Sequence, residues 1–99
     1  MKLVILDLAK EDLIDGYRFY EGQEAGLGNY FLDTLYSDID SLKLFGGIHR
    51  TAYKDLHRAL SKRFPFAIYY TLDLEILRVR SVVDCRKNPT WIRAHLRKA

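Results

Sequence analysis

The spacing of hydrophobic residues changes once along this chain of 99 residues, close to its middle. In the first half, apolar side chains recur every three or four positions, as on one face of a helix. In the second half they alternate or run continuously, as in strands. Because each kind of element has an apolar face to bury, the two halves must cover each other. The sequence therefore predicts one α+β domain over residues 1–99, since a chain of this length builds a single hydrophobic core.

The first half predicts a strand followed by an antiparallel helix hairpin. Residues 3–6 form a short apolar run, typical of a strand buried on both faces. Residues 10–24 and about 29–45 have helical spacing, and residues 26–28 hold two glycines that break the pattern. Gly46-Gly47 predicts a left-handed end to the second helix. The expected apolar stripes are Leu13, Ile14, Tyr17 and Tyr20 in the first helix, and Phe31, Leu32, Leu35, Ile39 and Leu42 in the second.

The second half predicts three strands and a short helix. The strand signal is weak over residues 53–60 and strong over residues 64–72 and 75–83, with Asp73 marking the turn. Asn88-Pro89 is typical of a helix start, with Asn as the cap and Pro in the first turn.

Strict alternation in the last strand predicts one apolar and one cationic face. The apolar face would hold Leu77, Val79, Ser81 and Val83, and the other face Arg78, Arg80, Val82 and Asp84. The predicted order is strand, helix, helix, three strands, helix. The hairpin would cover one face of a largely antiparallel sheet and leave the opposite face to Arg58, Arg78 and Arg80.

Charge is divided between the two halves of the chain. Residues 1–45 carry four basic and nine acidic side chains, a net −5, and residues 46–99 carry twelve basic and four acidic ones, a net +8. A basic second half favours a polyanion or an acidic protein surface as its partner, although the halves could also simply neutralise each other across the fold.

Several kinds of site are not indicated by the sequence. The single cysteine, Cys85, can close no internal disulfide, and His49, His57 and His95 lie too far apart for a metal-binding motif. No cofactor motif, signal peptide or membrane-length apolar segment is evident. We therefore expect a cytoplasmic protein without metal or cofactor. A nucleophilic role for Cys85 is less favoured than a place in the core.

One basic constellation remains as the candidate for function. Arginines beside aromatic side chains suit phosphates and stacked bases, and they equally suit an acidic protein partner or a solvated face without a specific partner. His57 and Asp84 are candidates for an acid–base pair. The constellation comprises Arg58, Lys62, Arg63, Arg78, Arg80, Arg86, Lys87, Arg93, Arg97 and Lys98, with Tyr69, Tyr70 and Trp91 near them in sequence.

Two motifs within this plan carry a family resemblance. The stretch Arg63-Phe-Pro-Phe-Ala-Ile-Tyr-Tyr and the ending Val82-Val-Asp-Cys-Arg-Lys-Asn-Pro-Thr-Trp-Ile-Arg resemble the RelE/ParE superfamily of toxins from bacterial type II toxin–antitoxin modules. The helical patterns Asp12-Leu13…Tyr17 and Phe31…Leu35 agree with it, so that the resemblance covers nearly the whole chain.

The resemblance implies a small toxin held in a hetero-oligomer by an antitoxin. RelE-like members cleave messenger RNA on the ribosome without a metal, whereas ParE-like members inhibit DNA gyrase by binding to it. Phe66 and Trp91 stand where RelE-like nucleases carry an arginine and a catalytic tyrosine, and the Asn-Pro-x-Trp context is more usual in ParE-like members. Asp84 departs from the histidine common in that branch. An inactive relic that only binds partners is a third reading.

These alternatives use overlapping residues. For gyrase inhibition, the expected target-binding residues are Arg58, Arg78, Arg80, Arg86, Lys87, Trp91 and Arg93. For the ribonuclease alternative, the expected catalytic residues are Arg58, Arg80, Arg86, His57 and Asp84.

Overall fold

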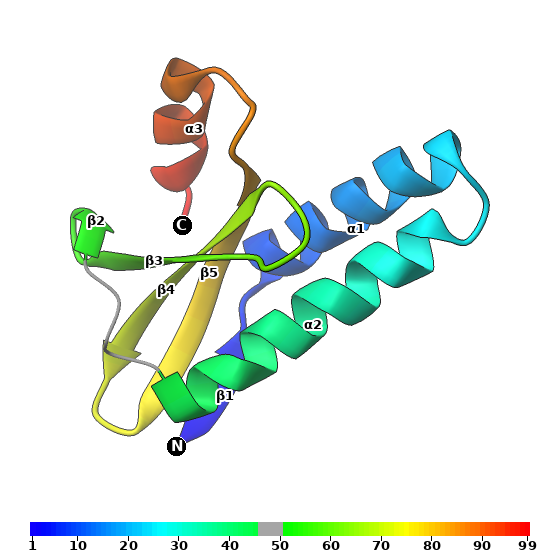
Figure 1. Ribbon diagram of the computed structural model, residues 1–99. Coiled ribbons are helices and arrows are strands. Elements are labelled where there is room, and N and C mark those ends of the chain that lie inside the picture. Colours follow the sequence, from blue (N-terminus) through cyan, green and yellow to red (C-terminus); the bar gives the residue numbers. More distant parts are fainter. Residues whose placement is uncertain (46–50) are drawn as a thin grey trace.

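Three helices and five strands make up residues 1–45 and 51–99, the part of the chain that a computed structural model describes (Figure 1). The predicted α+β class is confirmed, with one strand more than the sequence indicated. The predicted helix end at Gly46-Gly47 lies outside the described residues. The elements are β1 (Lys2–Ile5), α1 (Asp7–Gln23), α2 (Leu27–Phe45), β2 (Thr51–Tyr53), β3 (Leu56–Leu60), β4 (Phe66–Asp73), β5 (Ile76–Asp84) and α3 (Pro89–Leu96).

The strands form one mixed sheet in the order β1-β5-β4-β3-β2. Only β1 runs parallel to its neighbour, β5, and the other pairings are antiparallel, as expected. The expectation that the first strand is buried on both faces was wrong. Because β1 is an edge strand of the sheet, Lys2 is exposed and the rest of the strand is only half-buried.

The additional strand arises because a tight turn between β2 and β3 has no recognisable turn signal in the sequence. The region expected as one weak strand over residues 53–60 is two strands, β2 and β3, joined at Lys54 and Asp55. Lys54 adopts a φ of 51°, in the left-handed region where glycine or asparagine is usual. Leu74, with a φ of 55°, likewise makes the β4–β5 turn, whereas Asp73 still belongs to β4. Because lysine and leucine are poor turn signals, pattern reading misplaces both turns.

A β-bulge in β5 reverses the predicted alternation. Tyr69 pairs with Ser81 but Tyr70 pairs with Val79, so Arg80 is an extra residue on β5. Beyond the bulge, Val82 belongs to the core beneath the helix hairpin and Val83 to the cluster on the opposite face. The predicted grouping of Val83 with Leu77 and Val79, and of Val82 with the arginines, was therefore wrong.

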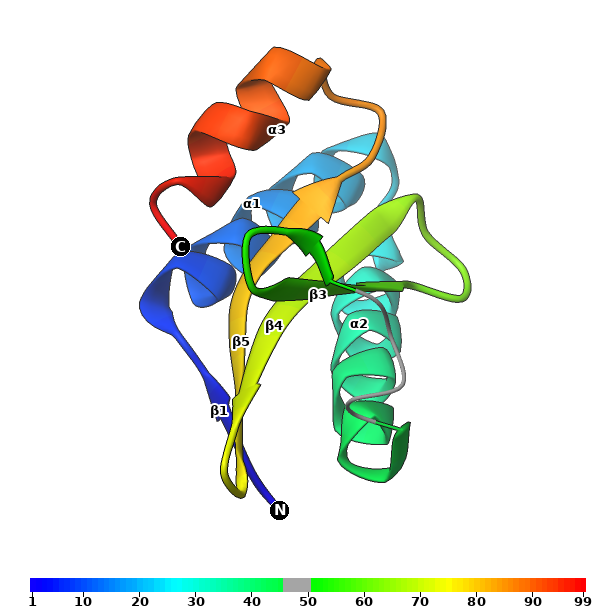
Figure 2. The same ribbon diagram turned by 90° about the vertical axis from the view of Figure 1, so that its left-hand side faces the viewer.

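Both faces of the sheet are covered, one by the helix hairpin and part of the other by α3 (Figure 2). The expectation that only arginines occupy the second face was wrong, because α3 packs on a part of it. Its packing residues are few because the helix is short. The buried members of this smaller cluster are Leu56, Ala67, Tyr69, Val83 and Leu96.

Both hairpin helices begin earlier than predicted, and a side chain caps the second of them. α1 begins at Asp7 and α2 at Leu27. The Glu21 carboxylate accepts hydrogen bonds from the backbone N–H groups of Gly26 at 3.1 Å and Gly28 at 3.0 Å. These amides have no partner within the helix, so an acceptor from α1 satisfies the start of α2.

Two glycines allow the hairpin helices to approach each other closely. A Cβ atom on Gly16 would lie 2.5 Å from the ring of Phe31. One on Gly28 would lie 2.7 Å from the ring of Tyr17 and 2.8 Å from the backbone oxygen of that residue. A methyl group at either position would therefore push the helices apart.

We expect Gly16→Ala and Gly28→Ala to lower the free energy of unfolding by about 1–3 kcal/mol each, because overpacked sites force backbone shifts. Gly22→Ala is the matched control, since a Cβ there meets nothing within 4 Å. It should be neutral or stabilise by up to about 1 kcal/mol, because alanine favours helix. Urea unfolding measures all three. Equal effects at Gly16 and Gly22 would contradict the close approach.

Candidate functional site

Arg58, Arg78 and Arg80 lie on the sheet face opposite the helix hairpin, and together they form what we call the arginine face. Cross-strand pairing places Arg58 beside Tyr69 and Arg78 beside Thr71. Arg80, in the bulge, donates from Nε to the Thr71 hydroxyl at 2.9 Å. The expectation that these three arginines share this face is therefore confirmed.

Hydroxyl groups hold two guanidiniums of the arginine face in place, those of Arg58 and Arg80. Arg58 donates from Nε to the Tyr69 hydroxyl at 3.2 Å and from Nη2 to the Cys85 sulfur at 3.5 Å. Burial lowers the pKa of Arg58, but its interactions with Tyr69 and Cys85 together outweigh burial, so the net direction of the pKa is upward. A hollow of about 260 Å³ beside Arg80 is lined by two further cations, Lys54 and Arg97, and by one acidic side chain, Asp55. The face therefore presents two held cations, Arg58 and Arg80, beside Arg78.

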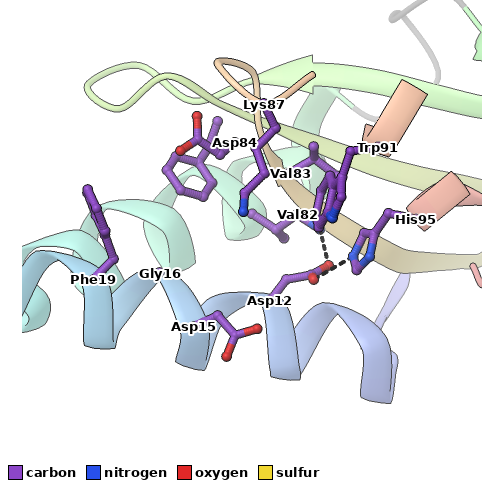
Figure 3. Close-up of a pocket in the computed structure, with 11 residues that line it drawn as sticks. Asp12, Asp15, Gly16, Phe19, Val82, Val83, Asp84, Lys87, Trp91 and His95 are labelled. Atoms are coloured by element: carbon purple, nitrogen blue, oxygen red, sulfur yellow. Dashed lines mark hydrogen bonds and ion pairs between the residues drawn. The ribbon is translucent and has the colours of Figure 1, made fainter. Parts of the chain in front are cut away.

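The buried carboxylate of Asp12, which is 8% exposed, joins three elements. Its Oδ2 accepts hydrogen bonds from the Val82 backbone N–H at 2.9 Å and from the Ser81 hydroxyl at 2.7 Å, both in β5. Its Oδ1 lies 2.7 Å from Nε2 of His95 in α3. Because Asp12 itself belongs to α1, one side chain connects that helix to β5 and to α3 (Figure 3).

Asp12 stands where β1 has ended. The parallel pairing of β1 stops at Ile5 opposite Val79, and the Leu6 N–H makes a last bond to the Val79 carbonyl at 2.9 Å. Past that point the chain turns into α1. The backbone N–H of Val82, three residues further along β5, therefore has no β1 carbonyl to bond. It donates to the Asp12 carboxylate instead.

Lys87, Trp91 and His95 form a stack of side chains along α3. The rings of Trp91 and His95 lie parallel, 4.6 Å apart with 11° between their planes, and the Lys87 ammonium lies 4.5 Å from the Trp91 ring centroid. The predicted cap is confirmed, since the Asn88 side chain accepts from the Thr90 N–H at 2.7 Å with Pro89 in the first turn. The helix is thus held at both ends.

These contacts leave a cavity of about 210 Å³ between α1, the end of β5 and α3, which we call the α1–α3 cleft (Figure 3). Phe19 on α1 and Trp91 on α3 flank it, 51% and 42% exposed. It is lined by Asp12, Asp15, Gly16, Phe19, Phe66, Val82, Val83, Asp84, Lys87, Trp91 and His95.

Arg86 is bound within the chain by Asp84, one of the residues that line this cleft. Its Nε and Nη2 donate to the two carboxylate oxygens of Asp84 at 3.0 and 2.9 Å, and Nη2 also donates to the Tyr20 hydroxyl at 3.3 Å. Burial raises the pKa of Asp84, but the hydrogen bonds from Arg86 and the positive charges of Arg86 and Lys87 together outweigh burial, so the net direction of the pKa is downward. The guanidinium of Arg86 is therefore occupied by a partner of its own chain.

His57 and Asp84, the acid–base pair suggested by the sequence, do not meet. His57 pairs with Tyr70 and its ring stacks on the tyrosine ring at 5.1 Å, on the hairpin face of the sheet. Asp84 pairs with Phe66, four positions before Tyr70 in β4. His57 also faces away from the arginine face. This pairing hypothesis was therefore wrong.

The predicted site residues thus divide into separate groups. Arg58, Arg78 and Arg80 form the arginine face, whereas Lys87 and Trp91 line the α1–α3 cleft. Arg86 is bonded to Asp84, and Arg93 is exposed on α3 with the Thr90 hydroxyl 3.5 Å away. Sequence reading missed Asp12, Ser81 and His95 as a set. One signal in the sequence could have placed Asp12 on the buried side of α1. Asp12 lies four residues before Gly16 and next to Leu13, and both of these residues are buried.

No group of three or more His, Cys, Asp or Glu side chains suited to a metal ion occurs within residues 1–45 and 51–99. Over the same residues, no helix has the length and apolar character needed to cross a membrane.

Known structures show what this fold is similar to, although neither protein-family models nor curated proteins gave a match to the sequence. A chain of the chromosomal ParDE toxin–antitoxin system from P. aeruginosa superposes with a TM-score of 0.78 at 15% identity, over 85% of this chain and 95% of that one. The isolated E. coli RelE toxin gives 0.58 at 14% identity, over 99% and 98%. The resemblance to the RelE/ParE superfamily therefore holds for the fold, with the ParDE chain the more similar of the two.

We expect Asp12→Ala to lower the free energy of unfolding by about 3 kcal/mol or more, because it leaves an amide, a hydroxyl and an imidazole without their buried acceptor. Asp15→Ala, an exposed aspartate on the same helix, should change stability by about 0.5 kcal/mol or less. Chemical unfolding followed by far-UV circular dichroism compares the two. Similar losses for both variants would contradict the central position of Asp12.

The Asp84–Arg86 pair predicts a pH-dependent difference between wild type and Arg86→Met. Because the folded-state pKa of Asp84 is lowered, its contribution to stability is present above the ordinary carboxyl range and is lost as pH falls through the folded-state pKa. Arg86→Met should therefore be less stable than wild type near neutral pH, with the difference shrinking below about pH 4. Denaturant titrations across this range test it. A difference independent of pH would contradict the pairing.

Proposed function

We propose that this chain is the toxin of a type II toxin–antitoxin module, that it inhibits DNA gyrase by binding to it, and that a cognate antitoxin neutralises it. The observation that carries the proposal is the arginine face on a fold shared with the ParDE and RelE chains. A rigid set of cations on a sheet suits an acidic protein surface or the DNA that such an enzyme holds.

Binding is favoured over RNA cleavage by what surrounds the arginines. Proton transfer requires an acid or base within hydrogen-bond reach of the reacting group. On the arginine face, the side-chain partners of Arg58 and Arg80 are the hydroxyls of Tyr69 and Thr71 and the thiol of Cys85, and neither of the two residues expected to handle the proton is among them. His57 is on the other face of the sheet, and Asp84 is engaged by Arg86. The residues proposed for a nuclease are therefore dispersed, which supports a binding role.

The antitoxin is the second partner of the proposal. The ParDE chain that this fold matches belongs to a toxin–antitoxin system, and the more similar fold is the better guide to the assembly. We expect a stable complex between this chain and a small protein encoded beside it. The runner-up, cleavage of ribosome-bound messenger RNA, is the reading to which the RelE likeness would lead.

Induction of the chain without antitoxin is expected to stop growth while protein synthesis continues. Gyrase inhibition blocks DNA synthesis first, whereas messenger RNA cleavage stops translation at once. Pulse labelling of DNA and protein after induction separates the two. Protein labelling that collapses before DNA labelling would overturn the gyrase proposal, and unaffected growth would overturn toxicity itself.

The target surface is tested by substitution within the arginine face. Arg80→Ala should relieve growth arrest at least about tenfold in colony counts, because a binding hot spot commonly contributes more than 1 kcal/mol. Arg18→Ala removes an exposed arginine from α1 and should leave the arrest intact. Thermal unfolding checks that both variants remain folded. A fully toxic Arg80→Ala chain would remove Arg80 from the target surface.

A further inference from the structure

The α1–α3 cleft has the construction of a pocket for a partner side chain. Its base is apolar, formed by Gly16, Phe66 and Val82. Phe19 and Trp91 stand at its two sides and remain about half exposed. Aromatic side chains left in water beside an apolar pocket are typical of protein-binding surfaces, because their burial supplies much of the binding energy.

The size of the cleft limits what it can hold. About 210 Å³ is below the roughly 300–1,000 Å³ of pockets that bind cofactors or drug-sized ligands. It suits one large aliphatic or aromatic side chain. The cleft is therefore matched to an anchor residue of a protein segment.

The charges around the cleft specify the neighbours of that anchor. Three aspartates line it, Asp12, Asp15 and Asp84, against a single lysine, Lys87. Asp12 and Asp84 are bonded within the chain, and the Lys87 ammonium lies over the Trp91 ring. Asp15 is exposed and has no ion pair among residues 1–45 and 51–99. A cationic group beside the anchor would complement Asp15.

The cleft is preformed, which lowers the cost of binding. Its α3 wall is fixed by the contact of His95 with Asp12, and its end by the Asn88 cap. Its β5 side is fixed by the two bonds of Asp12 to Ser81 and Val82. A partner would not need to order these walls on binding.

We propose that the α1–α3 cleft binds a segment of a partner protein that carries one large apolar side chain next to a lysine or arginine. The identity of that partner rests on the proposed function, in which it is the antitoxin. The cleft and the arginine face differ in charge and in their residues, so a basic and apolar segment has no reason to compete for the cations of that face.

The test uses a random peptide library panned on the purified full chain. Enriched peptides are expected to combine a large apolar residue with Lys or Arg. Synthetic copies without tryptophan should change the emission of Trp91, which is the only tryptophan of the chain. Their affinity should fall about tenfold for Asp15→Lys, where repulsion replaces attraction.

Asp33→Lys is the matched control, since it makes the same charge change at an exposed residue of α2 that does not line the cleft. It should bind the peptides as the wild type does, and circular dichroism verifies that both variants are folded. The proposal is overturned if no peptide is enriched, if Trp91 emission does not respond, or if both variants bind equally.

A separate measurement asks whether the antitoxin is the occupant. In cells, coexpression of the neighbouring reading frame should relieve growth arrest by wild type and Asp33→Lys but not by Asp15→Lys. Equal relief of both variants would overturn the antitoxin as occupant. A wild-type chain that never arrests growth would instead defeat the proposed function, while the peptide result would still decide whether the cleft binds its segment.

Discussion

The Asp12 carboxylate is the interaction on which the arrangement of this domain depends. A parallel edge strand of four residues, β1, ends before its neighbour does, and a carboxylate from the following helix takes its place at β5. The same carboxylate is also hydrogen-bonded to His95, near the opposite end of the chain. One buried polar group therefore sets the position of α1 against the sheet and of α3 against both. Because its partners are largely buried with it, the loss of any one member would leave another polar group of this network without a hydrogen-bond partner.

This arrangement produces two surfaces of different character. On the sheet, hydroxyls hold Arg58 and Arg80 as fixed cations beside Arg78. Between α1 and α3, aromatic side chains border an apolar cleft with aspartates at its edge. The helix α3 borders both, since its last residue, Leu96, lines the hollow near Arg80 and its Trp91 lines the cleft. A small domain can in this way present a target surface and a partner surface on either side of one short helix.

Much of the fold could be predicted from sequence because it depends on periodicity. The helical stripes, the glycine break near Gly26 and Gly28, the two strong strands and the Asn88 cap are local patterns, and the structure has them at or near the predicted places. The exception is Ile14, which was expected on the apolar stripe of the first helix but is 48% exposed. The errors have equally local causes. Lys54 and Leu74 turn the chain with positive φ angles that their side chains do not signal, and the bulge at Arg80 shifts every later residue of β5 to the other face.

The candidate site was predicted less completely, because it depends on contacts between distant residues. The sequence identified the three arginines of one face, since alternation within a strand is a local pattern. It did not identify Asp12, Ser81 and His95 as one network, because residues 69 or more positions apart meet there. The proposed pair of His57 and Asp84 was wrong because the register of β3 and β5 on β4 keeps the two residues apart, and no local sequence signal shows that register. Charge counts could not show that Arg86 is already occupied by Asp84.

We propose that the chain acts by binding gyrase through its arginine face. ATP-dependent supercoiling of relaxed plasmid by purified gyrase tests this when the purified chain is added, with ribosome-bound messenger RNA incubated in parallel. We expect the wild-type chain to inhibit supercoiling and the messenger RNA to stay intact. Normal supercoiling together with cleaved messenger RNA would contradict it.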